Sequence, residues 1–251
     1  MKRIYYFSLL IASLLTFSAS AQTADEIVSN YFENTGGLDA WNSIKALKYE
    51  GVINFGGTEL PMTMIQSTDG KQMVKADVQG VSFYQAVFDG ETLWGTNQIT
   101  MKAEKKDAES TSNTKLDMND MVDPLLNYKK KGYTLELIGK ETIDGTETFK
   151  LKLTTEPKMY EGEELPSVTF YYFDTENFVP IITESEVQSG QAKGMITQIK
   201  MSDYQEVDGV YFPFSMTTGV KGQPGGQEIT INKITVNPEL DDSIFAFPEE
   251  G

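Results

Sequence analysis

Most of the chain after residue 46 consists of short segments in which apolar and polar residues alternate. In the first of them, Leu47, Tyr49 and Ile53 alternate with polar neighbours such as Lys48. Similar segments lie at 58–67, 71–79, 81–88, 92–96, 133–143, 147–154, 167–173, 179–188, 194–204, 210–218 and 227–236. A period of two is typical of strands that bury one face, and turn dipeptides such as Asp69-Gly70 separate several of the segments. The pattern therefore predicts a long antiparallel meander.

Helical patterns precede and interrupt these strands. Apolar residues at helical spacing predict one helix after Thr23, ended by Gly36-Gly37, and a shorter one over 38–44. A polar segment, 102–113, is predicted to be a mobile loop and is followed by a predicted helix over 115–130 that ends at the lysines 129–131. Residues 156–166 are predicted to form an exposed hairpin loop. We expect a mainly β (α+β) domain: one curved antiparallel sheet with a few helices on its concave side.

The composition excludes several classes of function. The chain has no cysteine and no histidine, which excludes disulfides, cysteine nucleophiles, imidazole bases and most zinc or copper sites. Its only arginine is Arg3, and its net charge is −16, which opposes binding to nucleic acid and to anionic membrane surfaces.

The first 21 residues have the pattern of a secretory signal peptide. Lys2-Arg3 is followed by the apolar run 4–17 and by Ala19-Ser20-Ala21, which matches an A-x-A cleavage site. We expect cleavage before Gln22, and therefore export of residues 22–251. The apolar run is shorter than the roughly 20 residues that a membrane-spanning helix needs, and no later stretch is predicted to span a bilayer.

Catalytic and metal-binding patterns are weak. With 37 acidic residues, a pair of carboxylates at a catalytic separation can be imagined in many places, so composition nominates none of them. The acidic run 117–120 lacks the glycine and the closing glutamate of a calcium loop, and is better explained as a solvated helix face. We predict no catalytic residue, no metal site and no cofactor.

Methionine and phenylalanine recur on the predicted inner face of the sheet. Because the thioether side chain is flexible and polarizable, such a face accommodates apolar ligands of varied shape. The alternative is an ordinary packed core, but many strands with few helices leave a large concave apolar face to cover. The predicted apolar cavity is lined by Met62, Met64, Phe83, Trp94, Met118, Met121, Leu125, Met195, Ile199, Met201, Phe212 and Phe214.

Four short motifs lie at 88–94, 174–180, 207–213 and 237–245. In this order, they resemble motifs of the LolA-like family of outer-membrane lipoprotein carriers. The segment 88–94 is similar to the D-G-x-x-L-W hairpin of that family, and 174–180 is similar to its D-x-x-x-x-x-P turn. The segment 207–213 resembles its V-D-G-x-x-x-P element, and 237–245 its C-terminal ending. Together with the predicted signal peptide, these motifs span most of 22–251.

This resemblance implies an unclosed antiparallel β-barrel, with 22–251 as a lipid-binding domain. It also implies that the concave apolar side, covered by helices, carries the acyl chains of lipoproteins or other lipids across the periplasm, from an inner-membrane donor complex to an outer-membrane acceptor. The carriers rely on an arginine near the lid, which this chain lacks after residue 3, so no individual carrier residue is transferred.

Two other functions remain open at this stage. An envelope interaction module would dock a basic partner through a sheet edge or an acidic face and would keep the concave face as core. A carboxylate-dependent enzyme would act on a sugar or a peptide. For the carrier, we expect the 115–130 helix to be a hinged lid.

Overall fold

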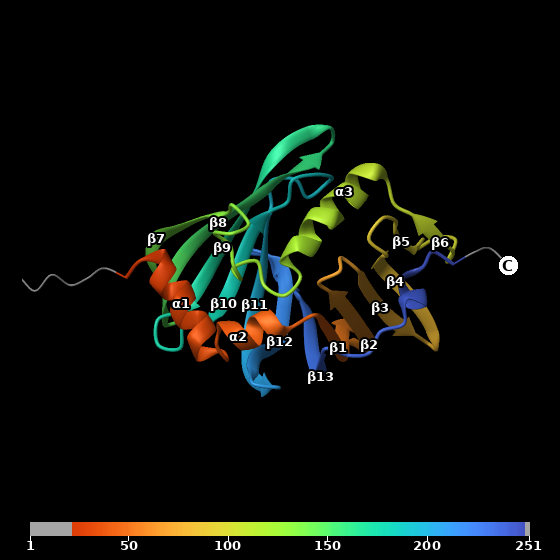
Figure 1. The fold of residues 1–251 in the computed structure, drawn as a ribbon. Helices are drawn as coiled ribbons and strands as arrows, with labels where there is room; N and C mark the ends of the chain where they lie inside the picture. The colour runs from red at the N-terminus through yellow and green to blue at the C-terminus, as the bar shows by residue number, and fades with distance from the viewer. Residues whose placement is uncertain (1–21, 249–251) are drawn as a thin grey trace, which may run out of the picture.

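A computed structural model describes residues 22–248. The predicted signal peptide, residues 1–21, lies outside the described residues, as do residues 249–251. The described chain forms a single 13-stranded antiparallel sheet, with three α-helices on one side of it (Figure 1). The predicted single curved sheet is confirmed.

The helices are α1 (Ala24–Asn34), α2 (Leu38–Ser43) and α3 (Ala108–Asp117), with two short 3-10 turns at Met118–Asp120 and Asp242–Phe245. The strands are β1 (Ala46–Phe55), β2 (Thr58–Ser67), β3 (Gln72–Val78), β4 (Val81–Phe88), β5 (Leu93–Thr96), β6 (Ala103–Lys105), β7 (Thr134–Ile143), β8 (Thr146–Tyr160), β9 (Glu163–Asp174), β10 (Pro180–Glu186), β11 (Ile196–Val207), β12 (Val210–Val220) and β13 (Gln227–Val236).

The sheet consists of two meanders joined at one seam. Its strand order is β6-β5-β4-β3-β2-β1-β13-β12-β11-β10-β9-β8-β7, so the first and last long strands of the chain pair in the middle of the sheet. The two edges, β6 and β7, are not paired with each other in the described part of the chain. The sheet is therefore an unclosed barrel, as expected.

Directly opposed residues of antiparallel strands share a face, which assigns every paired residue to one of two faces. Leu47, Leu151 and Phe173 pack together with residues of α1, so they lie on what we call the helix face. The opposite side is called the outer face.

The main core lies between α1, α2 and the strands at and beyond the seam. A capping box between Thr23 and Glu26 starts α1, whose buried side includes Tyr31 and Phe32. Trp41 of α2 packs against Phe32 and Phe212, with ring centroids 5.5 Å apart in each pair. This half of the helix face is sealed by aromatic packing.

A second, smaller core lies on the outer face of β2–β5. After β13, the chain crosses this face toward the β6 edge (Figure 1), where Phe245 is buried against Val87 and Trp94. The indole Nε1 of Trp94 donates a hydrogen bond of 3.0 Å to the Phe245 carbonyl oxygen. The C-terminal segment is therefore a structural cover for this outer face.

The prediction of a helix over 115–130 is wrong. The helix is α3, whose N-cap is Asp107 within the segment predicted to be a loop, and it ends at residue 117. Residues 121–132 form turns, because Pro124 disfavours the helical conformation at Asp123 and supplies no backbone N–H. The polar residues of 108–117 form the helix, and the apolar residues that follow it pack irregularly.

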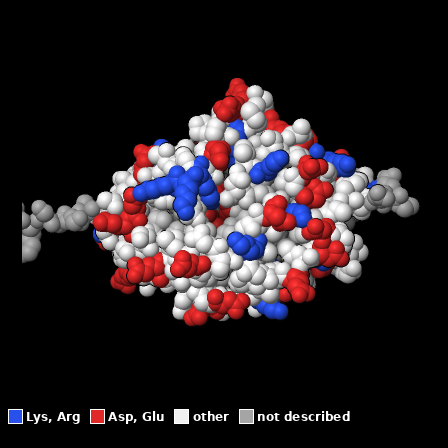
Figure 2. Space-filling view, in the orientation of Figure 1, with Lys and Arg blue, Asp and Glu red and all other residues white. Residues whose placement is uncertain are grey.

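Two related predictions also need correction. Residues 156–166 are not an exposed loop, because the β8–β9 ladder continues to Tyr160 and Glu163, and a bulge between Thr155 and Lys158 accommodates Pro157. The lysine triplet 129–131 does not end a helix. It lies in the turns between α3 and β7, where lysines gather in Figure 2.

Two of these three lysines pair with acids of other segments. Lys129 pairs with Asp25 of α1, and Lys131 with Asp120 at a distance of 2.7 Å. The two lysines thereby connect the turns to α1 and to the 3-10 turn that follows α3.

Candidate functional site

An apolar row crosses five adjacent strands on the helix face, through the seam of the sheet. Each residue in it is paired directly with the next, from β2 through β1, β13 and β12 to β11. The row is Leu60, Ile53, Ile229, Met216 and Met201, and all five are half-buried. A row of apolar side chains that is neither sealed nor fully exposed is unusual for the middle of a sheet, where packing normally removes them from water.

More apolar side chains extend this row over β2–β4. Met62 is paired with Ala76, which is paired with Phe83, and Met64 is paired with Val74. Met62 is buried and the other four are half-buried, and none of the five belongs to the three buried clusters found in residues 22–248. We call the row and these five residues the open apolar face.

Helix α3 crosses this part of the molecule without sealing it (Figure 1). None of residues 108–117, all of which the structure describes, is buried. The helix is rich in Ser, Thr and Asn, so it brings no large apolar surface to the sheet.

Polar contacts with the tip of the β8–β9 hairpin hold α3 in place. The side chain of Asn113 donates to the Met159 carbonyl oxygen at 2.6 Å and accepts from the Met159 N–H at 3.0 Å. The carboxylate of Glu109 accepts the N–H groups of Glu161 and Gly162 at 2.9 and 3.0 Å.

A third contact continues the same side of the helix, because Asp117 forms an ion pair with Lys158. Positions 109, 113 and 117 are spaced four residues apart and therefore share one face of α3. We call these three contacts the hairpin latch.

A pocket of about 300 Å³ lies between α2 and the turns after α3. Trp41, Met118 and Met121 line its apolar side, and Lys45 and Lys131 are among its polar residues. Met118 also packs against Phe88 on the helix face of β4. The pocket therefore adjoins the apolar residues of β4 and is accessible from outside.

Asp123 lines this pocket and is the most perturbed carboxyl group near it. Its Oδ1 accepts the Leu125 N–H at 2.7 Å, and its Oδ2 accepts the Tyr31 hydroxyl at 2.9 Å. Burial raises the pKa of Asp123 to about 6, although both hydrogen bonds and Lys131 favour its charged form.

Four tyrosines surround this carboxyl group. Burial, with a smaller effect of the Asp123 charge, raises the pKa values of Tyr31, Tyr49, Tyr171 and Tyr204. Sequence reasoning missed this group. The tyrosines are spread over α1, β1, β9 and β11, and the only local signal was an acidic residue before Pro124.

We predict that Asp123→Asn increases stability at neutral pH and not in acid. Folding raises the pKa of Asp123, so the stabilisation that its protonated form provides is complete below about pH 4 and is lost as the pH rises through about 6. The asparagine variant, which stays neutral, should be about 2 kcal/mol more stable than the wild type at pH 7.5 and equal to it at pH 4. Urea denaturation across this range measures the difference. Asp39→Asn, at an exposed site, is the control, and parallel curves for wild type and Asp123→Asn would contradict the prediction.

The structure distributes the twelve predicted ligand residues over several environments. Met62, Met64, Phe83, Ile199 and Met201 lie on the helix face outside the sealed core. Met118 and Met121 line the pocket beside it. Leu125, Phe212 and Phe214 are buried in the main core beneath α1 and α2. Met195 precedes β11 and is 40% exposed.

The placement of Trp94 differs from the prediction. It is paired with Val87, opposite Met73 and Ile65 on the outer face, and is buried there under the C-terminal segment. One residue of register places a side chain on the other face, so Trp94 is part of a structural core and not of a cavity on the helix face.

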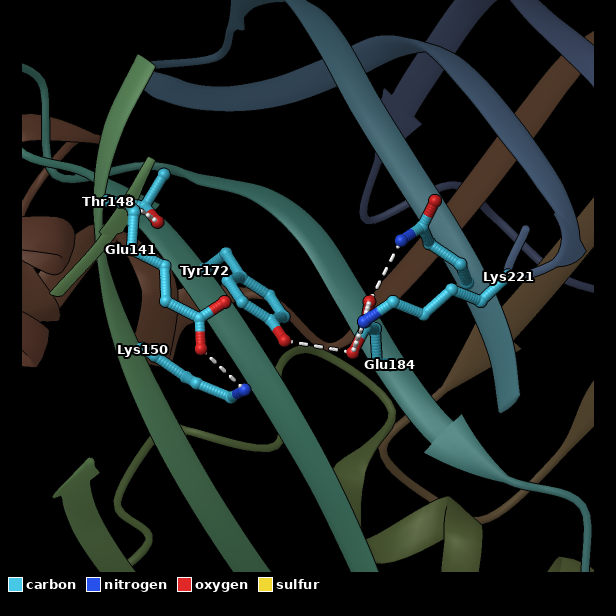
Figure 3. A network of polar contacts seen from close by, with 7 residues as sticks. Glu141, Thr148, Lys150, Tyr172, Glu184 and Lys221 are labelled. Carbon is cyan, nitrogen blue, oxygen red and sulfur yellow. Dashed lines mark hydrogen bonds and ion pairs between the residues drawn. The ribbon is translucent and has the colours of Figure 1, made fainter. Parts of the chain in front are cut away.

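A separate polar network lies on the outer face of β8–β12 (Figure 3). The buried carboxylate of Glu184 accepts hydrogen bonds from Tyr172 at 2.8 Å and from Gln198 at 2.9 Å, and pairs with Lys221 at 2.7 Å. Burial would raise the pKa of Glu184, but these three donors outweigh burial and lower it. The network is fully satisfied, which indicates a structural cross-strand role.

The C-terminal two thirds of the chain match a known family. The model of a family described as "Uncharacterized protein" matches residues 75–247. The chain belongs to this family. A search of curated proteins finds no match to the sequence. Among the described residues, no helix is long and apolar enough to cross a membrane.

Solved structures identify the fold of this family member as LolA-like. A LolA superfamily protein from Nitrosomonas europaea is 13% identical, with a TM-score of 0.55, over 90% of this chain and 98% of that one. A putative outer membrane lipoprotein-sorting protein domain from Vibrio parahaemolyticus is 10% identical, with a TM-score of 0.53, over 88% and 97%. A DUF1329 family protein from Desulfovibrio piger is 14% identical, with a TM-score of 0.54, over 90% and 98%.

Proposed function

We propose that this protein is a periplasmic carrier that holds the acyl chains of lipoproteins or other lipids during transport toward the outer membrane. The observation that carries the proposal is the open apolar face, with its continuous apolar row across five strands, which α3 crosses without burying any of its own residues. The LolA-like fold supports the same function.

Acyl-chain burial supplies enough affinity for such a carrier without polar recognition. Each buried methylene contributes about 0.8 kcal/mol, so a chain of ordinary length gains several kcal/mol from apolar contact alone. The methionines at 62, 64, 201 and 216 adapt to chains of different shape. The cargo is held and released unchanged, and the proposal assigns no catalytic residue and no cofactor.

The hairpin latch replaces, in this proposal, the arginine on which the lid of the carriers relies. Its contacts join α3 to the β8–β9 tip through polar groups, so they can break without exposing a packed apolar core. Opening would then cost little and would uncover the open apolar face.

Export and transfer partners are part of the same proposal. Cleavage before Gln22 would release the protein into the periplasm, where an inner-membrane donor would load it and an outer-membrane acceptor would unload it. N-terminal sequencing of the protein from a cell envelope fraction tests the cleavage, and should begin at Gln22.

Docking through a sheet edge is the weaker alternative. The exposed edge strand β7 has a bulge between Leu137 and Gly139 and carries charged residues such as Lys140 and Glu141. Bulges and charges are devices that prevent the pairing of edge strands with other chains.

Mass spectrometry of natively purified protein tests the proposed function. We expect co-purifying lipid or acylated lipoprotein, and binding of a fluorescent fatty acid after delipidation. A protein that carries no lipid and ignores added acyl ligands would contradict the proposal.

We predict that Met64→Asp lowers acyl-ligand affinity at least about tenfold while the protein stays folded. Met64 lies on the open apolar face, so a carboxylate there must be desolvated when an acyl chain binds. Thr63→Asp is the matched control, because its neighbouring position on the same strand points to the outer face. Fluorescence titration with a fatty-acid probe measures both, and equal affinities would place the ligand elsewhere.

A further inference from the structure

Exposed apolar side chains concentrate at two neighbouring hairpin turns. Ile99 is 92% exposed and Met101 54% exposed in the turn between β5 and β6. Val78 and Val81 flank the turn between β3 and β4, and Val81 is 58% exposed. These four make up almost half of the large apolar residues that are exposed in the described chain.

Both turns project from the same end of the sheet. Val78 and Val81 are the last pair of the β3–β4 ladder, and the Tyr84 N–H donates to the Thr96 hydroxyl at 2.9 Å, just before the β5–β6 turn begins. The two turns are therefore side by side at the open end of β4.

The β5–β6 turn presents Ile99 in a fixed geometry. The side-chain oxygen of Asn97 accepts the N–H groups of Ile99 and Thr100 at 2.8 and 3.0 Å. The main-chain carbonyl oxygen of Asn97 accepts the Met101 N–H at 2.8 Å. Its amide nitrogen donates to Glu104 at 2.6 Å. These hydrogen bonds hold the turn in a conformation that keeps Ile99 exposed to water. Burial of Ile99 against a partner would recover the free energy that this exposure costs.

We propose that these two turns are a membrane-docking tip that inserts Ile99, Met101 and Val81 into the interfacial layer of a phospholipid bilayer. The apolar residues stand on convex turns, and a fluid bilayer accepts convex apolar side chains without a preformed complementary pocket. The exposed lysines that follow the tip, Lys102, Lys105 and Lys106, are offset by the exposed acids Glu104 and Asp107, so the apolar side chains and not local charge carry the insertion.

Docking at this tip would bring α3, which crosses the open apolar face, close to the bilayer. The chain passes from β6, Ala103–Lys105, directly to Asp107, the N-cap of α3. This inference goes beyond the carrier function, since a protein can hold acyl chains without touching a membrane.

Flotation with vesicles of phosphatidylethanolamine and phosphatidylglycerol tests the proposal on the purified protein. Ile99→Asp with Met101→Asp should reduce the vesicle-bound fraction at least about tenfold, because both side chains would carry charge into the interfacial layer. Ile138→Asp, at another exposed apolar position on β7, should bind like the wild type. Circular dichroism should show the wild-type fold in both variants.

Salt distinguishes apolar insertion from charge attraction. Because the protein carries a net charge of −16, insertion should persist or strengthen as salt screens the repulsion from phosphatidylglycerol. Absence of wild-type binding, equal binding by the double variant, or loss of binding with added salt would each overturn the proposal. The double variant should bind fatty acid with the affinity of the wild type. The vesicle assay therefore tests the docking tip, and the fatty-acid titration tests the carrier function, independently of each other.

Discussion

Gly51→Ala should lower the free energy of unfolding by about 3 kcal/mol. A Cβ atom at position 51 would lie 2.2 Å from the Thr230 carbonyl oxygen, in the backbone of the neighbouring strand. The ladder shifts register between Glu50 and Gly51, at the seam where β1 and β13 join the two meanders. Alanine would force the two strands apart at the only junction between the halves of the described sheet. Urea denaturation measures the loss.

Glu50→Ala is the control for this prediction. Its side chain is exposed enough for its pairing with Lys48 to contribute less than about 1 kcal/mol. If both variants lose equally little stability, the close approach at the seam is absent in solution.

Asn113→Ala should release α3 from the hairpin and accelerate the exchange of acyl ligand by about tenfold or more. The substitution removes two hydrogen bonds to Met159, which together contribute about 1–3 kcal/mol to the closed position. Because none of residues 108–117 is buried, global stability should change by less than about 1 kcal/mol. Hydrogen exchange should show faster exchange across 108–117, and stopped-flow displacement of a fluorescent fatty acid measures the rate.

Ser112→Ala, at the adjacent exposed position of the same helix, should leave both measurements unchanged. A large loss of global stability in Asn113→Ala would show instead that α3 is part of the core. Unchanged exchange of α3 and of the ligand would show that the hairpin latch does not hold it.

The strands were predictable because alternation is a local signal that tertiary structure reinforces. Segments such as 58–67 and 81–88 coincide with β2 and β4, because apolar residues at every second position are enough to identify a strand with one buried face. The predicted position of the third helix is wrong because apolar spacing alone does not locate this helix. In the structure the cap at Asp107 and the proline at 124 decide where a helix can exist, and the helix α3 has no apolar face to detect.

The sequence predicts the kind of site, an apolar face of the sheet, better than it predicts which residues form it. Met62 and Met64 on alternate positions of β2 mark the open apolar face, but the same pattern does not separate Met201 of β11 from Phe212, which packs against Trp41 in the main core. The predicted face of Trp94 is wrong because the segment that buries it, around Phe245, lies 151 residues further along the chain. Asp123 lies in the turns after α3 and its four tyrosines lie on four other elements, which only the fold brings together.

The most direct test of the carrier proposal is photo-crosslinking with a diazirine fatty acid, followed by mapping of the labelled peptides. The open apolar face predicts label on β2, around Met62 and Met64, and on β11, around Met201, with competition by unlabelled fatty acid. Label confined to the outer face, or no label that unlabelled fatty acid displaces, would contradict the central claim that the helix face binds acyl chains.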